Sequence, residues 1–281
     1  MLSYRHAFHA GNHADVLKHY TLSVVLDYFN QKDKPYCVVD THAGAGMYAL
    51  DDAFSQKNRE FETGISHLLS AEKLPDSLRQ FVEMVQSFNT TKQIKLYPGS
   101  PKVSAYYLRQ NDQLRLFELH PNDYKILSEN FSGNDMQTKI KMQDGFNGIK
   151  ATLPPTTRRG IVMIDPPYES KDDYLHVVNT IKDCLKRFAT GTYIVWYPLL
   201  PKAEPLHMID SLHELQANNW LDARLLVSKP SSEGYGMYGS GLFIINPPWT
   251  LAKTLEDALP CLTALLGQSG HASYLLNSHI S

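Results

Sequence analysis

Cysteine is scarce in this sequence of 281 residues, and its placement argues against a disulfide framework. The three cysteines, Cys37, Cys184 and Cys261, lie far apart and form no C-x-x-C pair. An odd and scattered set is typical of proteins from a reducing compartment. The N-terminal segment lacks the apolar stretch of a signal peptide, and no run approaches the roughly 18 apolar residues of a membrane span. We therefore expect a soluble, cytoplasmic protein with no membrane contact.

An excess of charge of one sign is also lacking. Lysine and arginine number 27, and aspartate and glutamate number 29, which gives a net charge of -2. Charge therefore gives no global sign of a nucleic-acid partner, and the basic residues for such a partner would have to gather locally. Hydrophobic residues make up 43% of the chain, which is enough for a sizeable core. The length fits one large α/β domain, or such a domain with a small insertion.

Seven short apolar runs bounded by turn residues have the length and composition of strands. They are Tyr36–Asp40, Leu114–Leu119, Ile140–Asp144, Gly160–Asp165, Thr192–Tyr197, Ala223–Ser228 and Gly241–Asn246. Helical patterns separate most of them, for example over Pro121–Phe131 and Tyr174–Phe188. Strands that alternate with helices predict an α/β fold with a mostly parallel, seven-stranded sheet covered on both faces.

Two regions stand outside this alternation of strands and helices. Residues Asn12–Phe29 precede the first strand, and their apolar side chains lie near one face of a predicted helix. The long stretch Asp51–Lys95 separates the first two strands. Within it the residues with helical spacing are Leu78, Phe81, Val82, Val85 and Phe88, after a helix start signal at Pro75-Asp76-Ser77. We expect one domain over residues 1–281, with a small helical subdomain inserted at residues 51–95.

A glycine-rich turn follows the first strand, in the string Asp40-Thr41-His42-Ala43-Gly44-Ala45-Gly46. Gly44 and Gly46 would let the backbone approach a nucleotide-like ligand closely. The third glycine of the dinucleotide fingerprint is missing, which disfavours a dinucleotide site. Tight packing of the turn is the alternative interpretation of these two glycines.

Carboxylates end the second and third strands. Glu118 could accept hydrogen bonds from both ribose hydroxyls of a nucleoside. Asp144, which Gly145 follows, could bind the adenine amine of a cofactor. The alternatives are a solvated carboxylate for Glu118 and a simple turn for Asp144 and Gly145.

The fourth strand ends in Asp165-Pro166-Pro167-Tyr168, the most specific signal in the chain. The Asp165 carboxylate and the Pro166 carbonyl can both accept hydrogen bonds from one planar NH2 group. Such bonds draw the nitrogen lone pair out of conjugation and aim it at a methyl group. The prolines fix the backbone that carries these acceptors, and Tyr168 offers a ring on which a base can stack. This string predicts methyl transfer to a weakly basic amine.

The N-terminal segment combines aromatic, basic and histidine residues, a mixture that suits stacking on bases and contact with phosphates. The candidate substrate-binding residues are Tyr4, His6 and Lys18, with Arg5 beside them and Arg158 and Arg159 before the fourth strand as further local cations. The alternative interpretation is that this N-terminal segment is a solvated arm that does not bind the substrate. His9 and His13 have a spacing found in helical metal sites, but no cysteine or acidic partner completes such a site, so we expect no metal.

Together these motifs resemble those of class I, Rossmann-like methyltransferases that modify amino groups. The resemblance is closer to one bacterial family, the 23S ribosomal RNA adenine N6-methyltransferases known as RlmJ. It rests on the strings MLSYRHAFHAGNHADVLKH, DTHAGAG, YPGSP, ELHP, RRGIVMIDPPY, FATGTYIVWYP and INPPW, which span essentially the whole chain. His42 stands where class I enzymes usually have an aromatic residue such as Phe, and the family shares this departure.

The resemblance implies a cofactor, a partner and roles for single residues. The cofactor is S-adenosyl-L-methionine, and the residues at the family's cofactor positions are His19, His42, Ser100, Glu118, Asp144 and Gly145. Asp165 would hold the target amine and accept its proton, and Tyr4 would touch the RNA. The family also has a helical insertion. The target adenine of 23S ribosomal RNA would have to leave its stack to reach Asp165.

A second string, Asn246-Pro247-Pro248-Trp249, has the same pattern as the string at Asp165. Asp165 ends a strand whose carboxyl end should lie beside the glycine-rich turn, where open parallel sheets bind ligands. Asn246 ends the last predicted strand, which is antiparallel in methyltransferase sheets and would therefore end at the opposite edge. We assign the chemistry to Asp165 and a structural role to Asn246.

The motif at Asp165 by itself leaves other functions open. DNA adenine and a protein glutamine amide also present an NH2 group, and only the family resemblance favours ribosomal RNA. A non-catalytic RNA-binding protein with a degenerate methyltransferase fold is a third possibility, which the intact Asp165 and Glu118 oppose. We expect a monomer that acts on 23S ribosomal RNA.

Overall fold

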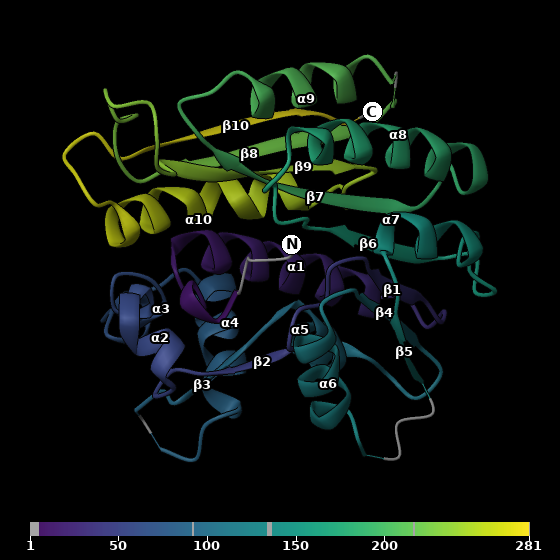
Figure 1. The fold of residues 1–281 in the computed structure, drawn as a ribbon, viewed down its shortest axis with the longest axis horizontal. Coiled ribbons are helices and arrows are strands. Elements are labelled where there is room, and N and C mark those ends of the chain that lie inside the picture. The colour runs from purple at the N-terminus through teal and green to yellow at the C-terminus, as the bar shows by residue number, and fades with distance from the viewer. Residues whose placement is uncertain (1–5, 92, 134–136, 216, 281) are drawn as a thin grey trace.

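The computed structural model describes residues 6–91, 93–133, 137–215 and 217–280. An eight-stranded sheet runs through the protein in the order β10-β8-β9-β7-β6-β1-β4-β5 (Figure 1). Its strands are β1 (Cys37–Asp40), β4 (Gln113–Glu118), β5 (Thr138–Met142), β6 (Gly160–Ile164), β7 (Thr192–Leu199), β8 (Trp220–Leu226), β9 (Gly239–Ile245) and β10 (Ser273–His279). The strands β5, β4, β1, β6 and β7 are parallel, and β9 is antiparallel to β7 and β8. The predicted mostly parallel α/β sheet is confirmed.

The predicted count of seven strands is wrong by one, because β10 extends the sheet beyond β8. β10 is an edge strand with most of its residues exposed, so its sequence has no continuous apolar run that would reveal it. Two further short strands, β2 (Met47–Ala49) and β3 (Leu96–Pro98), pair in a separate two-stranded sheet. Each has three residues, which is too short for a periodic pattern.

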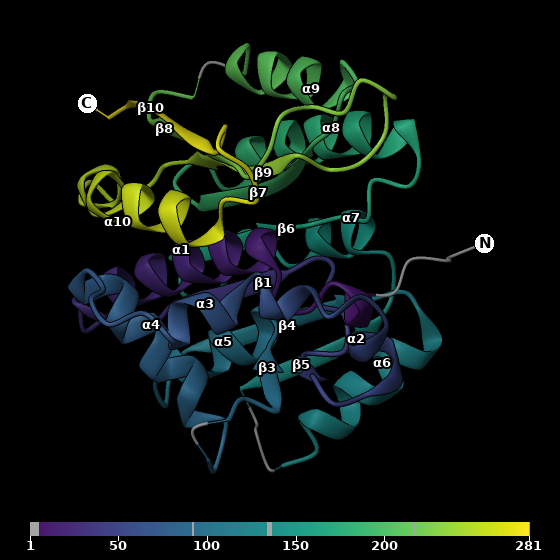
Figure 2. The ribbon, with the colours of Figure 1, turned by 90° about the vertical axis from the view of Figure 1, so that its left-hand side faces the viewer.

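Helices cover both faces of the large sheet, α1 and α10 on one side and α8 and α9 on the other (Figure 2). The helices are α1 (His13–Asn30), α2 (Ala53–Asn58), α3 (Ile65–Leu69), α4 (Asp76–Ser87), α5 (Ser100–Tyr107), α6 (Pro121–Asn130), α7 (Gly145–Gly148), α8 (Lys171–Arg187), α9 (Glu204–His213) and α10 (Leu251–Leu266), and the 3-10 turns are η1 (His6–Phe8), η2 (Glu60–Glu62) and η3 (Ile149–Ala151). Successive strand residues face opposite sides, since Val38 packs in the core under α1 and Val39 in the core under α8. Among the described helices, none is long and apolar enough to cross a lipid bilayer.

The helix α1 is buried along most of its length, which matters for the charged residues that it carries. Its N-cap Asn12 accepts hydrogen bonds from the backbone N–H groups of Ala14 and Asp15, each at 2.9 Å. This cap fixes where the helix begins. Because α1 packs against α5, α10 and β9, its residues Asp15 and Lys18 are buried as well. Buried charges need partners inside the protein, and both residues find them at the site described below.

The stretch predicted as an inserted subdomain contains α2, η2, α3 and α4. The expected helix is present as α4, which buries Leu78, Phe81 and Val85. These side chains belong to the same core as the apolar residues of α1 and α10. The division of the chain into a domain and an inserted subdomain at residues 51–95 stays a prediction.

Candidate active site

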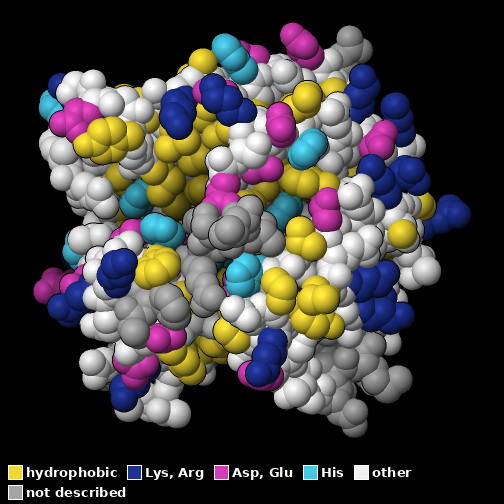
Figure 3. Space-filling model, in the orientation of Figure 1, with side chains coloured by type: hydrophobic (Ala, Val, Ile, Leu, Met, Phe, Trp, Pro, Cys, Tyr) yellow, Lys and Arg dark blue, Asp and Glu magenta, His cyan; other side chains and the backbone are white. Residues whose placement is uncertain are grey.

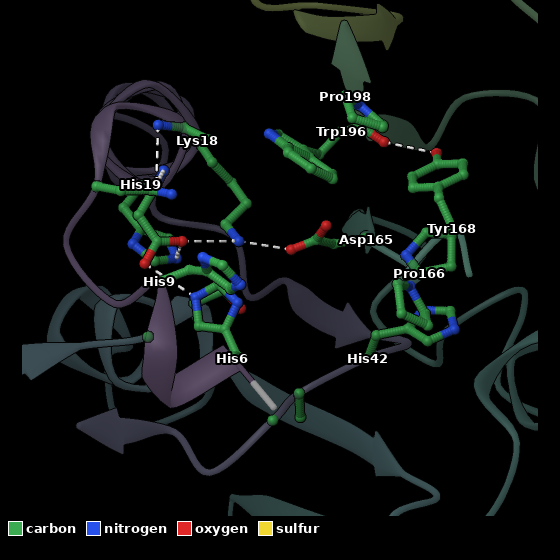
Figure 4. A pocket seen from close by; sticks show the side chains of 18 of the residues that line it. His6, His9, Lys18, His19, His42, Asp165, Pro166, Tyr168, Trp196 and Pro198 are labelled. Carbon is green, nitrogen blue, oxygen red and sulfur yellow. Dashed lines mark hydrogen bonds and ion pairs between the residues drawn. The ribbon is translucent and has the colours of Figure 1, made fainter. Parts of the chain in front are cut away.

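A cavity of about 320 Å³ opens at the carboxyl ends of the parallel strands β1, β4 and β6. Its walls come from η1, α1, the turn after β1, the ends of β4 and β6, and the strand β7 (Figure 4). On the face shown in Figure 3, a hollow lined by hydrophobic side chains has histidine side chains at its rim. The predicted residues that line the cavity are His6, Lys18, His19, His42, Gly44, Ser100, Glu118, Asp165, Pro166 and Tyr168.

The two glycines of the turn after β1 differ in their position relative to the cavity. Gly44 lines the cavity with a φ of 59°, and its backbone N–H donates to Glu118 Oε2 at 2.7 Å. Gly46 has a φ of 77° and lies against α6, where an added Cβ would come within 2.8 Å of Leu127 Cδ1. An added Cβ at Gly44 would come within 2.3 Å of Tyr48 Oη, so both the ligand and the packing interpretation suit Gly44, whereas Gly46, which is not part of the cavity wall, suits the packing interpretation.

Glu118 ties the glycine-rich turn to the end of β4. Its two carboxylate oxygens accept hydrogen bonds from the backbone N–H groups of Gly44 and His120, each at 2.7 Å. Burial raises the pKa of Glu118, although these two hydrogen bonds oppose the shift. Each oxygen keeps a second lone pair, and the residue lines the cavity, so it can still accept bonds from a ligand.

Asp40, the last residue of β1, was not among the predicted site residues. It is 1% exposed and accepts hydrogen bonds from Ser100 Oγ at 2.7 Å and from the backbone N–H of His42 at 3.2 Å. Burial raises its pKa to about 6. Asp40 thus fixes two residues of the cavity wall from behind. The available signal was its position as the acid that ends the first strand, immediately before the glycine-rich turn.

Lys18 is buried, whereas a residue that binds phosphate is expected to be exposed at the surface. Its side chain is only 5% exposed, and its Nζ is 2.5 Å from Asp165 Oδ2 and 3.0 Å from Asp15 Oδ1 (Figure 4). The ammonium thus bridges two carboxylates inside the cavity, which does not suit the predicted contact with phosphates, and a role of Lys18 in substrate binding stays a prediction. Asp15, which the sequence did not single out, also accepts a hydrogen bond from His6 Nε2 at 2.9 Å.

The strand β7 supplies Trp196, which faces the residues that follow β6. The Tyr168 hydroxyl donates to the Trp196 carbonyl at 2.7 Å, and the Tyr168 ring lies 4.6 Å from that of Tyr174. Tyr168 has a φ of 52°, a left-handed conformation that is rare for a residue with a side chain. Within the described residues the buried Trp196 Nε1 has no hydrogen-bond partner. Trp196 and Pro198 line the cavity, and the strand pattern alone did not reveal them.

Two histidines, the buried His19 and the partly buried His42, line the cavity in their neutral forms. Burial lowers the pKa of His19 to about 3 and that of His42 to about 4. His19 Nδ1 is 2.9 Å from Tyr97 Oη, while the buried His19 Nε2 has no hydrogen-bond partner among the described residues. The His42 ring meets Phe146 edge to face, with 4.8 Å between ring centroids.

Asp144 and Gly145 lie behind the turn after β1 and are not part of the cavity wall. The Asp144 carboxylate caps α7 by accepting a hydrogen bond from the backbone N–H of Phe146 at 2.8 Å. An added Cβ at Gly145 would come within 1.9 Å of the Thr41 carbonyl, so only glycine fits there. These contacts fit the turn interpretation, and the binding of the cofactor by Asp144 and Gly145 stays a prediction. Tyr4 lies outside the described residues.

Asn246 lies at the opposite edge of the sheet, as predicted, because β9 runs antiparallel to β7. Its side-chain amide donates to the carbonyls of Ala189 and Gly191, both at 2.8 Å, and so fixes the turn that precedes β7. Arg158 and Arg159 also lie at this edge, since they precede the first residue of β6. The strand β6 runs its full length between them and Asp165, and their predicted contact with RNA stays a prediction.

The fold and the cavity at the carboxyl ends of β1, β4 and β6 define a Rossmann-like, class I methyltransferase. The chain belongs to the family described as Ribosomal RNA large subunit methyltransferase D, RlmJ, whose model matches residues 33–276. The resemblance seen in the sequence is thereby confirmed.

Individual proteins of known name are similar along almost the whole chain. The Ribosomal RNA large subunit methyltransferase J of Escherichia coli (strain K12) is 43% identical, over 97% of this chain and 98% of the relative. Its namesake from Haemophilus influenzae is 44% identical, over 98% and 97%. A crystal structure of protein LPL1258 from Legionella pneumophila has a TM-score of 0.89 at 35% identity, and the match covers 96% of this chain and 98% of that one.

Proposed function

We propose that this protein transfers a methyl group from S-adenosyl-L-methionine to N6 of an adenine in 23S ribosomal RNA. The observation that carries the proposal is the position of Asp165. Its carboxylate reaches the cavity at the same sheet edge as the Gly44 turn and Glu118. Two relatives that share more than two fifths of this sequence are named as large-subunit ribosomal RNA methyltransferases.

The residues of the cavity fit the proposed cofactor. Carboxylates outnumber cations in the described wall, where Asp15, Glu118, Asp123 and Asp165 stand against Lys18, and this balance favours a positively charged ligand. Glu118 would accept hydrogen bonds from the ribose hydroxyls. The unpartnered Nε2 of the neutral His19 can bond to a polar group of the ligand. When bound, the cofactor supplies an electrophilic methyl group.

We assign the remaining predicted residues to supporting places around this cofactor. Ser100 and His42 would shape its pocket, with Asp40 holding both from behind. Asp144 and Gly145 would act through the turn that they support, because neither lines the cavity. Tyr4 and His6 would lie on the side of the RNA.

Asp165 and Pro166 would prepare the target amine. The two acceptors orient one NH2 group, so that its lone pair points away from the ring system, and Asp165 accepts the proton that the nitrogen releases. Tyr168 and Trp196 supply aromatic surface in the same wall. The Asp165 side chain is only 14% exposed, so a base stacked in RNA could not reach it. The adenine would have to flip out, at a cost of a few kcal/mol.

The decisive experiment incubates the protein with labelled S-adenosyl-L-methionine and unmodified 23S RNA, and then maps the modified base. We expect one N6-methyladenine. Equal or faster transfer to a DNA adenine or to a glutamine peptide would assign the chemistry to those substrates instead. A protein that binds RNA and fails to bind the cofactor in calorimetry would be the non-catalytic alternative.

A further inference from the structure

Asp15 lies at the centre of a network of hydrogen bonds and ion pairs to which the proposed reaction assigns no role. It lies in the first turn of α1 and is 1% exposed. Its Oδ2 accepts hydrogen bonds from the backbone N–H of Gly11 at 3.0 Å and from His6 Nε2 at 2.9 Å. Its Oδ1 lies 3.0 Å from Lys18 Nζ and 4.0 Å from His19 Nε2. Three of these four neighbours, together with Asp15 itself, line the cavity.

The network keeps Asp15 negatively charged in spite of its burial. Burial by itself would raise the pKa of Asp15. The neighbouring charges of His6 and Lys18, together with the hydrogen bond from His6, outweigh burial and hold this pKa well below its usual range. A helix N-terminus also favours a negative charge in its first turn. Asp15 is therefore a fixed anion, while the Lys18 side chain that it binds is long and can move.

Two carboxylates compete for the Lys18 ammonium. Nζ lies 2.5 Å from Asp165 and 3.0 Å from Asp15, so it occupies an acceptor oxygen that the target amine needs. If the amine displaced Lys18 and no second anion were present, the buried ammonium would have lost both of the carboxylates that balance its charge, at high cost. Asp15 removes this cost, because Lys18 keeps one partner while it gives up the other.

We propose that Asp15 is a positioning residue for methyl transfer, which holds the Lys18 ammonium beside Asp165 and retains it when the target amine takes its place there. The inference rests on the proposed function, because it assigns a residue to that same reaction. It explains why the buried carboxylate of Asp15 binds His6 of η1 and Lys18 of α1, the residue whose ammonium also contacts Asp165. Asp15 acts through Lys18 and need not touch the substrate.

A double-mutant cycle of Asp15→Asn and Lys18→Met separates this role from a structural one. Asparagine keeps the size of the side chain and removes its charge. We expect Asp15→Asn to lower kcat for RNA methylation by about 10- to 100-fold, the range for a preorganised polar contact, with KM for the cofactor changed less than about threefold. Because Asp15 acts through Lys18, the double variant should be no slower than Lys18→Met alone. The proposal would be overturned if the losses of kcat in the two single variants multiplied in the double variant, or if Asp15→Asn kept the full kcat.

A charge-preserving variant and a matched control guard against misfolding. Asp15→Glu keeps the anion, so we expect it to retain more activity than Asp15→Asn, and equal losses in the two would contradict the role of the charge. Asp112 is also 1% exposed and binds Arg109 at 2.9 Å, but it does not line the cavity. Asp112→Asn should lower the melting temperature and leave kcat unchanged. An unmodified protein that fails to methylate RNA would reject the proposed function itself, whereas multiplying losses in an active protein would reject only this inference.

Discussion

The two Pro-Pro strings of this chain lie at opposite edges of one sheet. Asp165 follows β6 and reaches the cavity, where its carboxylate meets a buried ammonium. Asn246 follows β9, and its side-chain amide donates hydrogen bonds to the carbonyls of Ala189 and Gly191. The aromatic ends of the strings differ as well, since Tyr168 is 9% exposed and Trp249 is 72% exposed.

The direction of the strand that carries such a string determines which edge of the sheet the string reaches. Both strings contain a left-handed residue, the last of one string, Tyr168 with a φ of 52°, and the first of the other, Asn246 with a φ of 51°. Only the parallel strand β6 delivers its string to the edge where the turns after β1 and β4 converge. The same local chemistry therefore holds a turn at one edge and lines a ligand cavity at the other.

The largest effect should come from Asp165→Ala. We expect turnover to fall by about a hundredfold or more, because one of two acceptors aimed at the target amine is lost. The fold should survive, since Lys18 keeps Asp15 as a partner. Methylation kinetics and cofactor calorimetry on the same preparation would show a loss of turnover with cofactor affinity nearly unchanged. Full activity in Asp165→Ala would place the chemistry at another residue.

Glu118→Ala should weaken cofactor binding by about 1.5–3 kcal/mol, the range for hydrogen bonds to a charged group. The variant removes the acceptor for the ribose and also frees the N–H groups of Gly44 and His120. Calorimetry on the folded variant measures the effect. Glu214, which follows the last residue of α9 and does not line the cavity, offers a control, and Glu214→Ala should bind the cofactor normally. An unchanged affinity in Glu118→Ala would reduce Glu118 to a support for the turn.

Asn246→Ala should cost stability and leave activity intact, which is the reverse of Asp165→Ala. Two hydrogen bonds are lost at a left-handed position, so we expect a loss of about 1–3 kcal/mol in the free energy of unfolding. Asn246→Gly relieves the backbone strain and loses only the hydrogen bonds, so it should be destabilised less. Denaturant melts and methylation assays test both variants. A large loss of turnover in stable Asn246 variants would break the assignment of the two edges.

Buried histidines near the cavity should make stability depend on pH. Burial lowers the pKa of His13 to about 4, so below pH 6.5 the unfolded chain takes up a proton that the folded chain refuses. Stability is thus fully present above pH 6.5 and is lost as the pH falls toward 4. For His13→Gln we expect the loss between pH 7.5 and pH 5 to be smaller by about 2 kcal/mol. The raised pKa of Asp40 changes stability with pH in the opposite direction. This contribution is the same in the His13 variant and in the unmodified protein, so it cancels when the two are compared.

The smallest effect concerns the salt dependence of RNA binding. Each phosphate contact adds roughly 0.7–0.9 units to the slope of log affinity against log salt. Because Lys18 is buried between two carboxylates, we expect Lys18→Met to leave this slope unchanged. Arg158 is exposed at the edge of the sheet where Asn246 lies, and Arg158→Ala serves as the comparison variant. It should lower the salt slope only if the bound RNA extends from the cavity edge of the sheet to this opposite edge. A loss of one unit in Lys18→Met would restore Lys18 as a phosphate contact.

The strands and the main catalytic candidate were predictable because their signals are local. Seven apolar runs became the strands β1 and β4–β9, and the acids Glu118 and Asp165 were recognised by their places at strand ends. β10 was missed because an exposed edge strand has no apolar pattern. Asp15 and Asp40 were missed because their importance lies in their partners, which sequence patterns do not show.

The amino-acid sequence was enough to place the turns, the acids and bases and the family resemblance, since spacing and residue type are properties of neighbours in the chain. Which of the two similar strings faces a cavity became clear from the folded sheet alone, because it depends on the direction of the strand that carries the string. The tertiary structure also brings Lys18 into contact with Asp165 across 147 residues of sequence. A lysine is exposed by default, and only the packing of α1 against the sheet turns it into a buried cation that must find its carboxylates.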